Sequence, residues 1–240
     1  MKTNKNILKY NEKFIHYYSD FIPHKIRELI DNNNFKIIAD IGCGDGALLY
    51  AFKINGLLEK FDKIYAVDIS EERLERVKKI DNKILTVCDD AMLLEKTKNL
   101  DSMDFIVCNQ LIEHVPDDDK TIKSISNILK KNGLCYISTV YKKWYGWYFY
   151  KNKVGKWVID PTHEREYTRE EQLLNLFEKH NLDVIYENKI IFKFPILDFF
   201  LKRVGFKQDV YENNKILKFL RNIKIPILGY YYWEIVAKKK

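Results

Sequence analysis

The sequence contains few of the residues that build disulfide-stapled domains or metal centres. Among 240 residues there are only four cysteines, five prolines and nine glycines. The cysteines, Cys43, Cys88, Cys108 and Cys135, are far apart along the chain, and each falls in or just after an apolar run. No two of them have the close spacing of a zinc site or a redox motif. We therefore predict reduced, mostly buried thiols and no bound metal.

Long hydrophobic runs are missing as well. No stretch approaches the roughly twenty apolar residues that a membrane-spanning helix needs. Residues 1–11 are polar and carry three lysines, unlike the apolar core of a secretory signal peptide. We expect a cytoplasmic protein with no transmembrane span. With 240 residues, of which 46% are hydrophobic, the chain is large enough to form one domain with a full core.

Three of the few glycines stand together on alternate positions. An apolar run that contains Asp40 is followed by Gly42, Gly44 and Gly46. Because glycine has no Cβ, a strand-to-helix turn built this way adopts positive φ angles at little cost and lets a ligand approach the main chain. The acids Asp40 and Asp45 would repel a diphosphate and attract a ligand that carries an ammonium and a sulfonium. The turn therefore predicts a site for a cationic small molecule.

Polar residues follow the next three strand-like runs. Asp68 ends the first of them, about twenty residues after the last of these glycines, where a doubly wound sheet places the carboxylate that binds a ribose. The other two runs are followed by Asp89, Asp90 and Ala91, and by Asn109 and Gln110. Open α/β sheets bind ligands at the carboxyl ends of their strands, so we expect these side chains to surround one site.

Five sequence blocks resemble the motifs of class I S-adenosylmethionine-dependent methyltransferases, in a group similar to quinone-biosynthesis and sugar methyltransferases. The blocks are 39–46, 66–70, 88–91, 109–117 and 129–134. The resemblance implies S-adenosylmethionine as cofactor and S-adenosylhomocysteine as its product. It assigns the glycine turn to the methionine part, Asp68 to the ribose, and either Asp89 or Asp90 to the adenine. The implied cofactor-binding residues are Asp40, Gly42, Cys43, Gly44, Gly46, Asp68, Ile69, Asp89, Asp90, Ala91, Asn109 and Gln110.

The order of the runs and the resemblance imply an α/β fold. We expect a Rossmann-like, doubly wound, mostly parallel seven-stranded sheet with an antiparallel last strand and helices on both faces. The single domain would span residues 1–240, with an N-terminal helical segment (1–34), a cofactor-binding core (35–140) and a substrate and lid region (141–240). The last region would hold a final β-hairpin with an insertion at about 192–226. Ser70 and Thr168 are predicted to cap the helices that follow them.

Charge and aromatic residues are concentrated in the second part of the chain. Residues 1–140 hold 21 Lys and Arg against 22 Asp and Glu, whereas residues 141–240 hold 20 against 12 and all four tryptophans. The segment 141–157 is the richest in aromatic side chains. It indicates either packing on the core or an aromatic-walled pocket with lysines at its rim, which would suit an anionic or glycan-like acceptor.

A proton acceptor is expected in the polar loop at 160–167. Methyl transfer to oxygen benefits from a general base, and histidine has the side chain whose ordinary pKa lies nearest neutrality. His163 is the first candidate, and Glu164 or Glu166 would orient or replace it. A structural hydrogen-bonding role for His163 is the alternative. His114, which follows the fourth strand, is expected to be structural or to lie beside the cofactor.

The expected activity is methyl transfer to a small molecule, to an oxygen on a sugar, a phenol or quinone, or a lipid-linked compound. The alternatives are an RNA or protein methyltransferase and a non-catalytic cofactor-binding scaffold subunit. The basic second half favours nucleic acid, but the sequence after Asn109 lacks the prolines and aromatic residue typical of enzymes that methylate base amines. The mixed apolar and basic run at 190–203 leaves peripheral membrane contact open.

Overall fold

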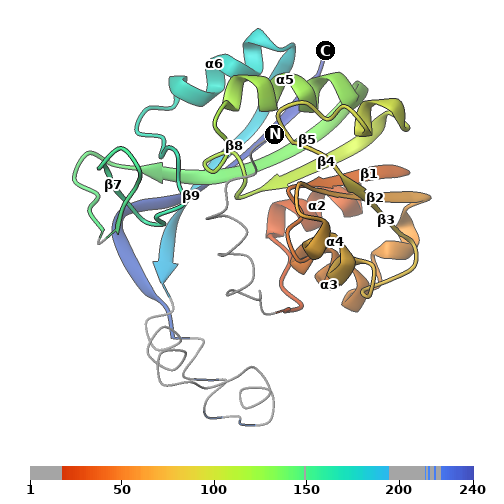
Figure 1. Cartoon of the computed structure of the whole chain (residues 1–240), viewed down its shortest axis with the longest axis horizontal. Coiled ribbons are helices and arrows are strands. Elements are labelled where there is room, and N and C mark those ends of the chain that lie inside the picture. Colours follow the sequence, from red (N-terminus) through yellow and green to blue (C-terminus); the bar gives the residue numbers. More distant parts are fainter. Residues whose placement is uncertain (1–17, 149, 195–213, 215, 217–218, 220–222) are drawn as a thin grey trace.

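The computed structural model describes residues 18–148, 150–194 and 223–240, together with 214, 216 and 219. A seven-stranded sheet crosses the molecule in the order β3-β2-β1-β4-β5-β9-β8 (Figure 1). Its strands are β1 (Ile37–Ile41), β2 (Lys63–Asp68), β3 (Ile84–Cys88), β4 (Met103–Asn109), β5 (Leu129–Lys142), β8 (Leu182–Phe194) and β9 (Ile225–Lys239). Strands β1 to β5 are parallel, and β9 is antiparallel to both β5 and β8. The predicted fold is confirmed.

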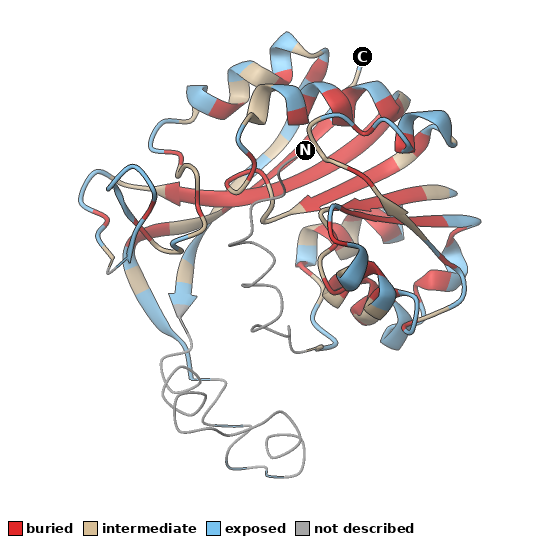
Figure 2. Cartoon of the chain, in the orientation of Figure 1, coloured by how far each residue is buried: buried red, intermediate tan, exposed pale blue. Residues whose placement is uncertain are grey.

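Helices cover both faces of the sheet. Figure 1 shows α5 (Asp118–Ile128) and α6 (Glu171–Lys179) on one face, and α2 (His24–Asn32), α3 (Ala47–Ile54) and α4 (Glu71–Val77) on the other. Each face has its own buried apolar cluster, and the strands between them are buried along most of their length (Figure 2). Strands buried on both faces read as continuous apolar runs, which is why the core strands were visible in the sequence.

Two predicted helix caps have different outcomes. The Ser70 hydroxyl accepts a hydrogen bond from the backbone N–H of Arg73, so Ser70 caps α4 as predicted. The prediction for Thr168 is wrong, because α6 begins at Glu171 without a side-chain cap. Instead, the Gln172 side-chain oxygen accepts from the backbone N–H groups of Thr168 and Arg169, both at 2.9 Å.

The predicted N-terminal helical segment is only partly confirmed. Among the described residues the helix starts at His24, and the stretch from Tyr18 to Pro23 is not helical. Residues 1–17 lie outside the described part. Tyr18 stacks on Tyr50 at 4.7 Å and donates a hydrogen bond to the Asp45 carbonyl, so this segment contacts the glycine turn.

The final hairpin is confirmed, with longer strands than predicted. Strand β8 runs to Phe194 and β9 begins at Ile225, and β9 lies between β5 and β8. Most of the predicted insertion at about 192–226 lies outside the described residues. A small hairpin of β6 (Tyr150–Lys151) and β7 (Trp157–Val158) follows β5. None of the helices in the described part is both long and apolar enough to span a bilayer.

Candidate functional site

The glycine turn has the geometry that the sequence predicted. Gly42, Gly44 and Gly46 all have positive φ, at 73°, 56° and 81°. A Cβ added to Gly42 would lie 2.6 Å from a methyl carbon of Leu111, and one added to Gly46 would lie 2.6 Å from Ile80. Side chains of the protein itself therefore pack against Gly42 and Gly46 and exclude any larger residue there, whereas a Cβ on Gly44 would meet only the Arg73 guanidinium, at 3.4 Å.

Two acids meet beneath this turn, at the ends of β1 and β2. The Asp68 carboxylate accepts hydrogen bonds from the backbone N–H groups of Gly44 and Ser70, both at 2.9 Å. Asp40 is buried, and burial together with the charge of Asp68 raises the pKa of Asp40 to about 7. A cationic ligand would relieve the repulsion between the two carboxylates. The two carboxyl groups thus fit a ligand with an ammonium or sulfonium group and a hydroxylated ribose.

Asp45 does not contribute free charge to this site. Its carboxylate forms a buried ion pair with Arg76, with 2.7 Å between the Arg76 nitrogen and the Asp45 oxygen. The sequence argument that Asp40 and Asp45 act together on the ligand is therefore corrected: Asp40 and Asp68 form the acidic pair. The backbone of Cys43 donates to the Val67 carbonyl and its thiol is buried, so Cys43 contributes main chain to the turn.

The two acids after β3 have different surroundings. Asp89 accepts hydrogen bonds from the backbone N–H groups of Asp90, Lys96 and Thr97 and from the Thr97 hydroxyl, so both of its oxygens organise the loop. Within the described part of the chain, Asp90 accepts one hydrogen bond, from the backbone N–H of Met92 at 2.9 Å. The Ala91 carbonyl is taken by Ser124, and Ile69 is half exposed. Of the two acids, Asp90 has the greater capacity left for an adenine.

A polar network holds the residues that follow β4. The Asn109 side-chain oxygen accepts from the hydroxyls of Ser138 and Tyr232. Gln110 has φ of 53° and its N–H donates to the Ser138 carbonyl at 3.0 Å. Tyr232 comes from β9, far away in sequence, and sequence reasoning did not find it. No local signal identified it, because its contact depends on β9 pairing with β5.

His163 lies in a buried polar pocket, 5% exposed. Its Nδ1 is 3.1 Å from Glu166 Oε1. Burial opposes protonation, but the hydrogen bond to Glu166 and the charges of Glu113 and Asp160 outweigh it, so the pKa of His163 is raised above its ordinary 6.5. Glu164, in contrast, points to the surface and pairs with Lys153. Glu166, not Glu164, therefore orients the histidine.

The structure adds two residues to this cluster. Glu113, His114 and His163 each present one ligand atom, and these atoms lie within 4.8 Å of one another. The Thr139 hydroxyl donates to Glu113, and His114 Nδ1 lies 3.1 Å from the Thr162 hydroxyl. With both Nδ1 atoms occupied, each Nε2 remains as the second ring nitrogen. These three side chains have the types and the spacing that could hold a divalent ion. The spacing of the cysteines did not indicate this site; in the sequence, only the adjacent Glu113 and His114 pointed to it.

Backbone contacts tie the two halves of the cluster together. The N–H of Glu164 donates to the Glu113 carbonyl at 2.9 Å. The Arg165 guanidinium donates to the carbonyls of Ile112, Val115 and Pro116. The loop before α6 is thereby fixed against the loop after β4.

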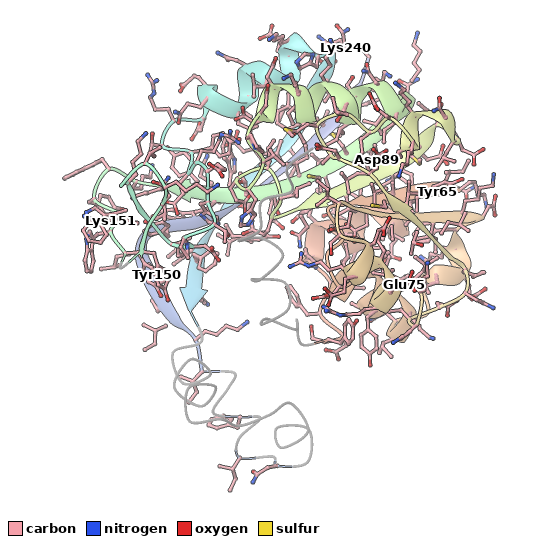
Figure 3. The ribbon with its side chains drawn as sticks, viewed as in Figure 1. Tyr65, Glu75, Asp89, Tyr150, Lys151 and Lys240 are labelled. Atoms are coloured by element: carbon pink, nitrogen blue, oxygen red, sulfur yellow. The ribbon has the colours of Figure 1, made fainter. Side chains whose placement is uncertain are left out.

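The aromatic segment forms a pocket next to this cluster. A pocket of about 650 Å³ is lined by Lys142–Trp147, Asn152, Lys156–Val158, Glu164–Glu166, Thr168 and Gln172. The segment lies at the far end of the molecule from α4, as the labels Tyr150, Lys151 and Glu75 show in Figure 3. Trp144 is 90% exposed and Trp147 and Trp157 are about half exposed, so these rings are not core residues. The pocket interpretation of this segment is supported over simple core packing.

The predicted membrane-contact run at 190–203 falls mostly outside the described residues. Ile190 and Ile191 are about half exposed on β8. Membrane contact stays a prediction, and co-sedimentation with anionic vesicles would test it.

Comparisons with known proteins agree with this geometry. The family model described as "Methyltransferase domain" matches residues 14–187. A ubiquinone biosynthesis O-methyltransferase from Pelagibacter ubique is 30% identical over 190 residues, which cover 69% of this chain and 74% of that protein. A ubiquinone biosynthesis O-methyltransferase from Coxiella burnetii is 32% identical over 109 residues, which cover 44% of this chain and 44% of that protein.

Solved structures show the same fold. A geranyl diphosphate methyltransferase in complex with S-adenosylmethionine has a TM-score of 0.55 and 14% identity, covering 90% of this chain and 84% of that one. At this identity the likeness concerns the fold alone.

Proposed function

Because this chain belongs to the S-adenosylmethionine-dependent methyltransferase family, we propose that it methylates a hydroxyl oxygen of a small molecule. The acceptor oxygen would belong to a sugar, a phenol or quinone, or a lipid-linked compound. The observation that supports this most directly is the buried His163–Glu166 pair, which the fold holds against Glu113 and His114 just after β4.

The cofactor residues fit the proposal. S-adenosylmethionine, when bound, supplies a methyl group that its sulfonium has already activated, so the protein's main task is positioning. The glycine turn and Asp40 would hold the methionine part, Asp68 the ribose, and Asp90 with Ala91 the adenine edge. Asn109, fixed by two hydroxyl donors, would present its amide N–H groups toward the reacting region.

His163 is suited to take the acceptor's proton. When Nδ1–H donates to Glu166 Oε1, the proton-free nitrogen is Nε2. The acceptor hydroxyl would transfer its proton to Nε2, and the resulting imidazolium would be stabilised by the Glu166 and Glu113 carboxylates. Glu166 is in this account a positioning residue.

One observation favours a second way to activate the same hydroxyl. Glu113, His114 and His163 offer a carboxylate oxygen and two imidazole nitrogens, a donor set that suits a divalent transition metal ion. Such an ion would lower the pKa of a coordinated hydroxyl. Chelation separates the two readings: activity that EDTA abolishes and a divalent ion restores would assign the activation to the ion.

Transfer of a labelled methyl group to a panel of acceptors tests the proposal. The panel contains hexoses, catechols, hydroquinones, a lipid-linked glycan, RNA and a protein extract. Labelled product from a small hydroxylated compound, lost in His163→Ala, supports it. Labelling of RNA or protein alone would move the assignment to a macromolecular methyltransferase. Cofactor binding without any product would support the scaffold alternative.

A further inference from the structure

We propose that the pocket lined by residues 142–172, the aromatic pocket, binds an anionic, hydroxylated ring in the non-reacting part of the acceptor. This inference rests on the proposed methyl transfer and specifies the chemistry of its substrate. Three features of the pocket support it: aromatic walls, a polar floor, and lysines at the rim.

The walls present aromatic faces to a ligand. The Trp147 and Trp157 rings lie 5.8 Å apart at 56°, and both are about half exposed. Their loop is docked on β9, where the N–H of Lys143 donates to the Gly229 carbonyl at 2.8 Å. A Cβ on Gly146 would lie 2.9 Å from that same carbonyl, so glycine is what allows the close approach. The wall is preformed, and preformed aromatic faces bind rings at a low entropic cost.

The floor contains the buried carboxylate of Glu166. The Glu166 side chain is 3% exposed. Its Oε1 accepts from the Ile159 N–H at 2.6 Å and contacts His163. The Lys142 ammonium lies 3.7 Å from Oε2, and the hydrogen bond with Glu166 helps burial to raise the pKa of the Tyr230 hydroxyl. The inner end of the pocket is therefore polar, which suits a hydroxylated ring better than a purely apolar one.

Charge at the rim selects an anion. Lys143 and Lys156 line the pocket, and among the described residues neither forms an ion pair with an acid; the Lys143 ammonium lies 5.2 Å from the centre of the Tyr141 ring. Glu164, the acid nearest the rim, is already paired with Lys153. An anionic substituent on the ring would therefore meet net positive charge at the mouth, while its hydroxyl meets Glu166 inside.

The geometry also connects this pocket to the chemistry. Glu166 lines the pocket, and one of its carboxylate oxygens contacts His163. A ring seated on Glu166 would thus be held next to the proposed base. Binding energy from such a remote group is used to position the reacting hydroxyl.

Calorimetry on the full chain tests the inference, with glucose 1-phosphate and 4-hydroxybenzoate as probes at millimolar concentration. Glucose, phenol and inorganic phosphate are the controls. We expect at least one anionic ring to bind and each control to bind at least fivefold more weakly. The ring that binds identifies the source, a sugar phosphate or a phenolic acid. No binding of either ring, or equal binding of inorganic phosphate alone, would overturn the inference.

Two variants locate the site. Trp147→Ala and Lys156→Gln are each expected to lower the affinity for the probe at least fivefold, because the first removes a stacking face and the second a rim charge. Lys123→Gln is the control: it removes one exposed lysine charge from α5, and Lys123 does not line the pocket. Unchanged probe binding in both pocket variants would refute the location. S-adenosylmethionine affinity is measured in parallel, since its loss in the parent protein would instead refute the proposed function.

Discussion

At the scale of single residues, the site depends on charges that the fold buries. Asp40 and Asp68 face each other beneath the glycine turn, and His163 and Glu166 form a buried pair. The sequence located Asp40, Asp68 and His163 because strand ends and polar loops are visible locally. It left Glu164 and Glu166 open as partners of His163; Glu166 makes that contact, whereas Glu164 pairs with Lys153 of the β6–β7 hairpin.

Asp40→Asn should weaken the binding of S-adenosylmethionine and stabilise the cofactor-free protein against unfolding at alkaline pH. The folded pKa of Asp40 is raised from 3.8 to about 7, so the folded state loses stability as pH rises through that window. Removing the charge should restore up to about 4 kcal/mol at pH 8 and less than half of that at pH 5. Denaturant unfolding at both values, with calorimetry of S-adenosylmethionine, checks this. Unchanged cofactor affinity would show that Asp40 does not face the ligand.

His163→Ala should lower kcat by about 10²- to 10⁴-fold without changing cofactor affinity. Because the pKa of His163 is raised above 6.5 and the base acts in its neutral form, the rate should increase with pH through a midpoint above that value. Glu166→Gln removes the largest of the contributions that raise this pKa and should move the midpoint down. A pH profile that is the same in the parent and Glu166→Gln would contradict the assignment.

At the scale of helices and strands, the sequence predicted those elements whose position depends on neighbouring residues. The core strands and the Ser70 cap followed from runs and spacing. The cap at Thr168 failed because α6 begins only at Glu171, and Gln172, its second residue, accepts the Thr168 N–H that a capping box would give to the side chain of Glu171. Within the described residues the predicted N-terminal helix is interrupted between Tyr18 and Pro23, where Tyr18 stacks on Tyr50 instead of continuing the helix.

Gly42→Ala should reduce cofactor affinity at least tenfold. Its Cβ would clash with Leu111 at 2.6 Å and its φ of 73° strains any other residue, so the turn must shift. Gly56→Ala is the matched control, because Gly56 has φ of 67° and nothing within 4 Å. The control should cost about 1 kcal/mol of stability and leave cofactor affinity intact. Equal loss of affinity in both variants would indicate a general folding defect.

At the scale of the whole molecule, the fold assembles what no local pattern showed. Glu113 and His114 follow β4, and His163 lies in the connection between β5 and α6. Because β4 and β5 are neighbouring parallel strands, both segments start at the same edge of the sheet, where they meet. The Tyr232 contact with Asn109 likewise depends on β9 entering between β5 and β8. Long-range pairings of this kind cannot be inferred from one sequence by spacing alone.

Arg165→Ala tests the connection between the two loops. Three backbone carbonyls would lose a charged donor, so we expect a loss of about 2–3 kcal/mol in unfolding free energy and a lower kcat. Arg169→Ala, at an exposed position before α6, is the control. Thermal unfolding and steady-state kinetics check both. An Arg165→Ala variant with normal stability and kcat would show that the loops hold together without it.

Calorimetric titration of the purified protein with S-adenosylmethionine, and in parallel with NAD, tests the central claim most directly. The acidic pair beneath the glycine turn predicts one site for S-adenosylmethionine and no binding of the diphosphate NAD. Binding of NAD, or no binding of S-adenosylmethionine, would contradict the account.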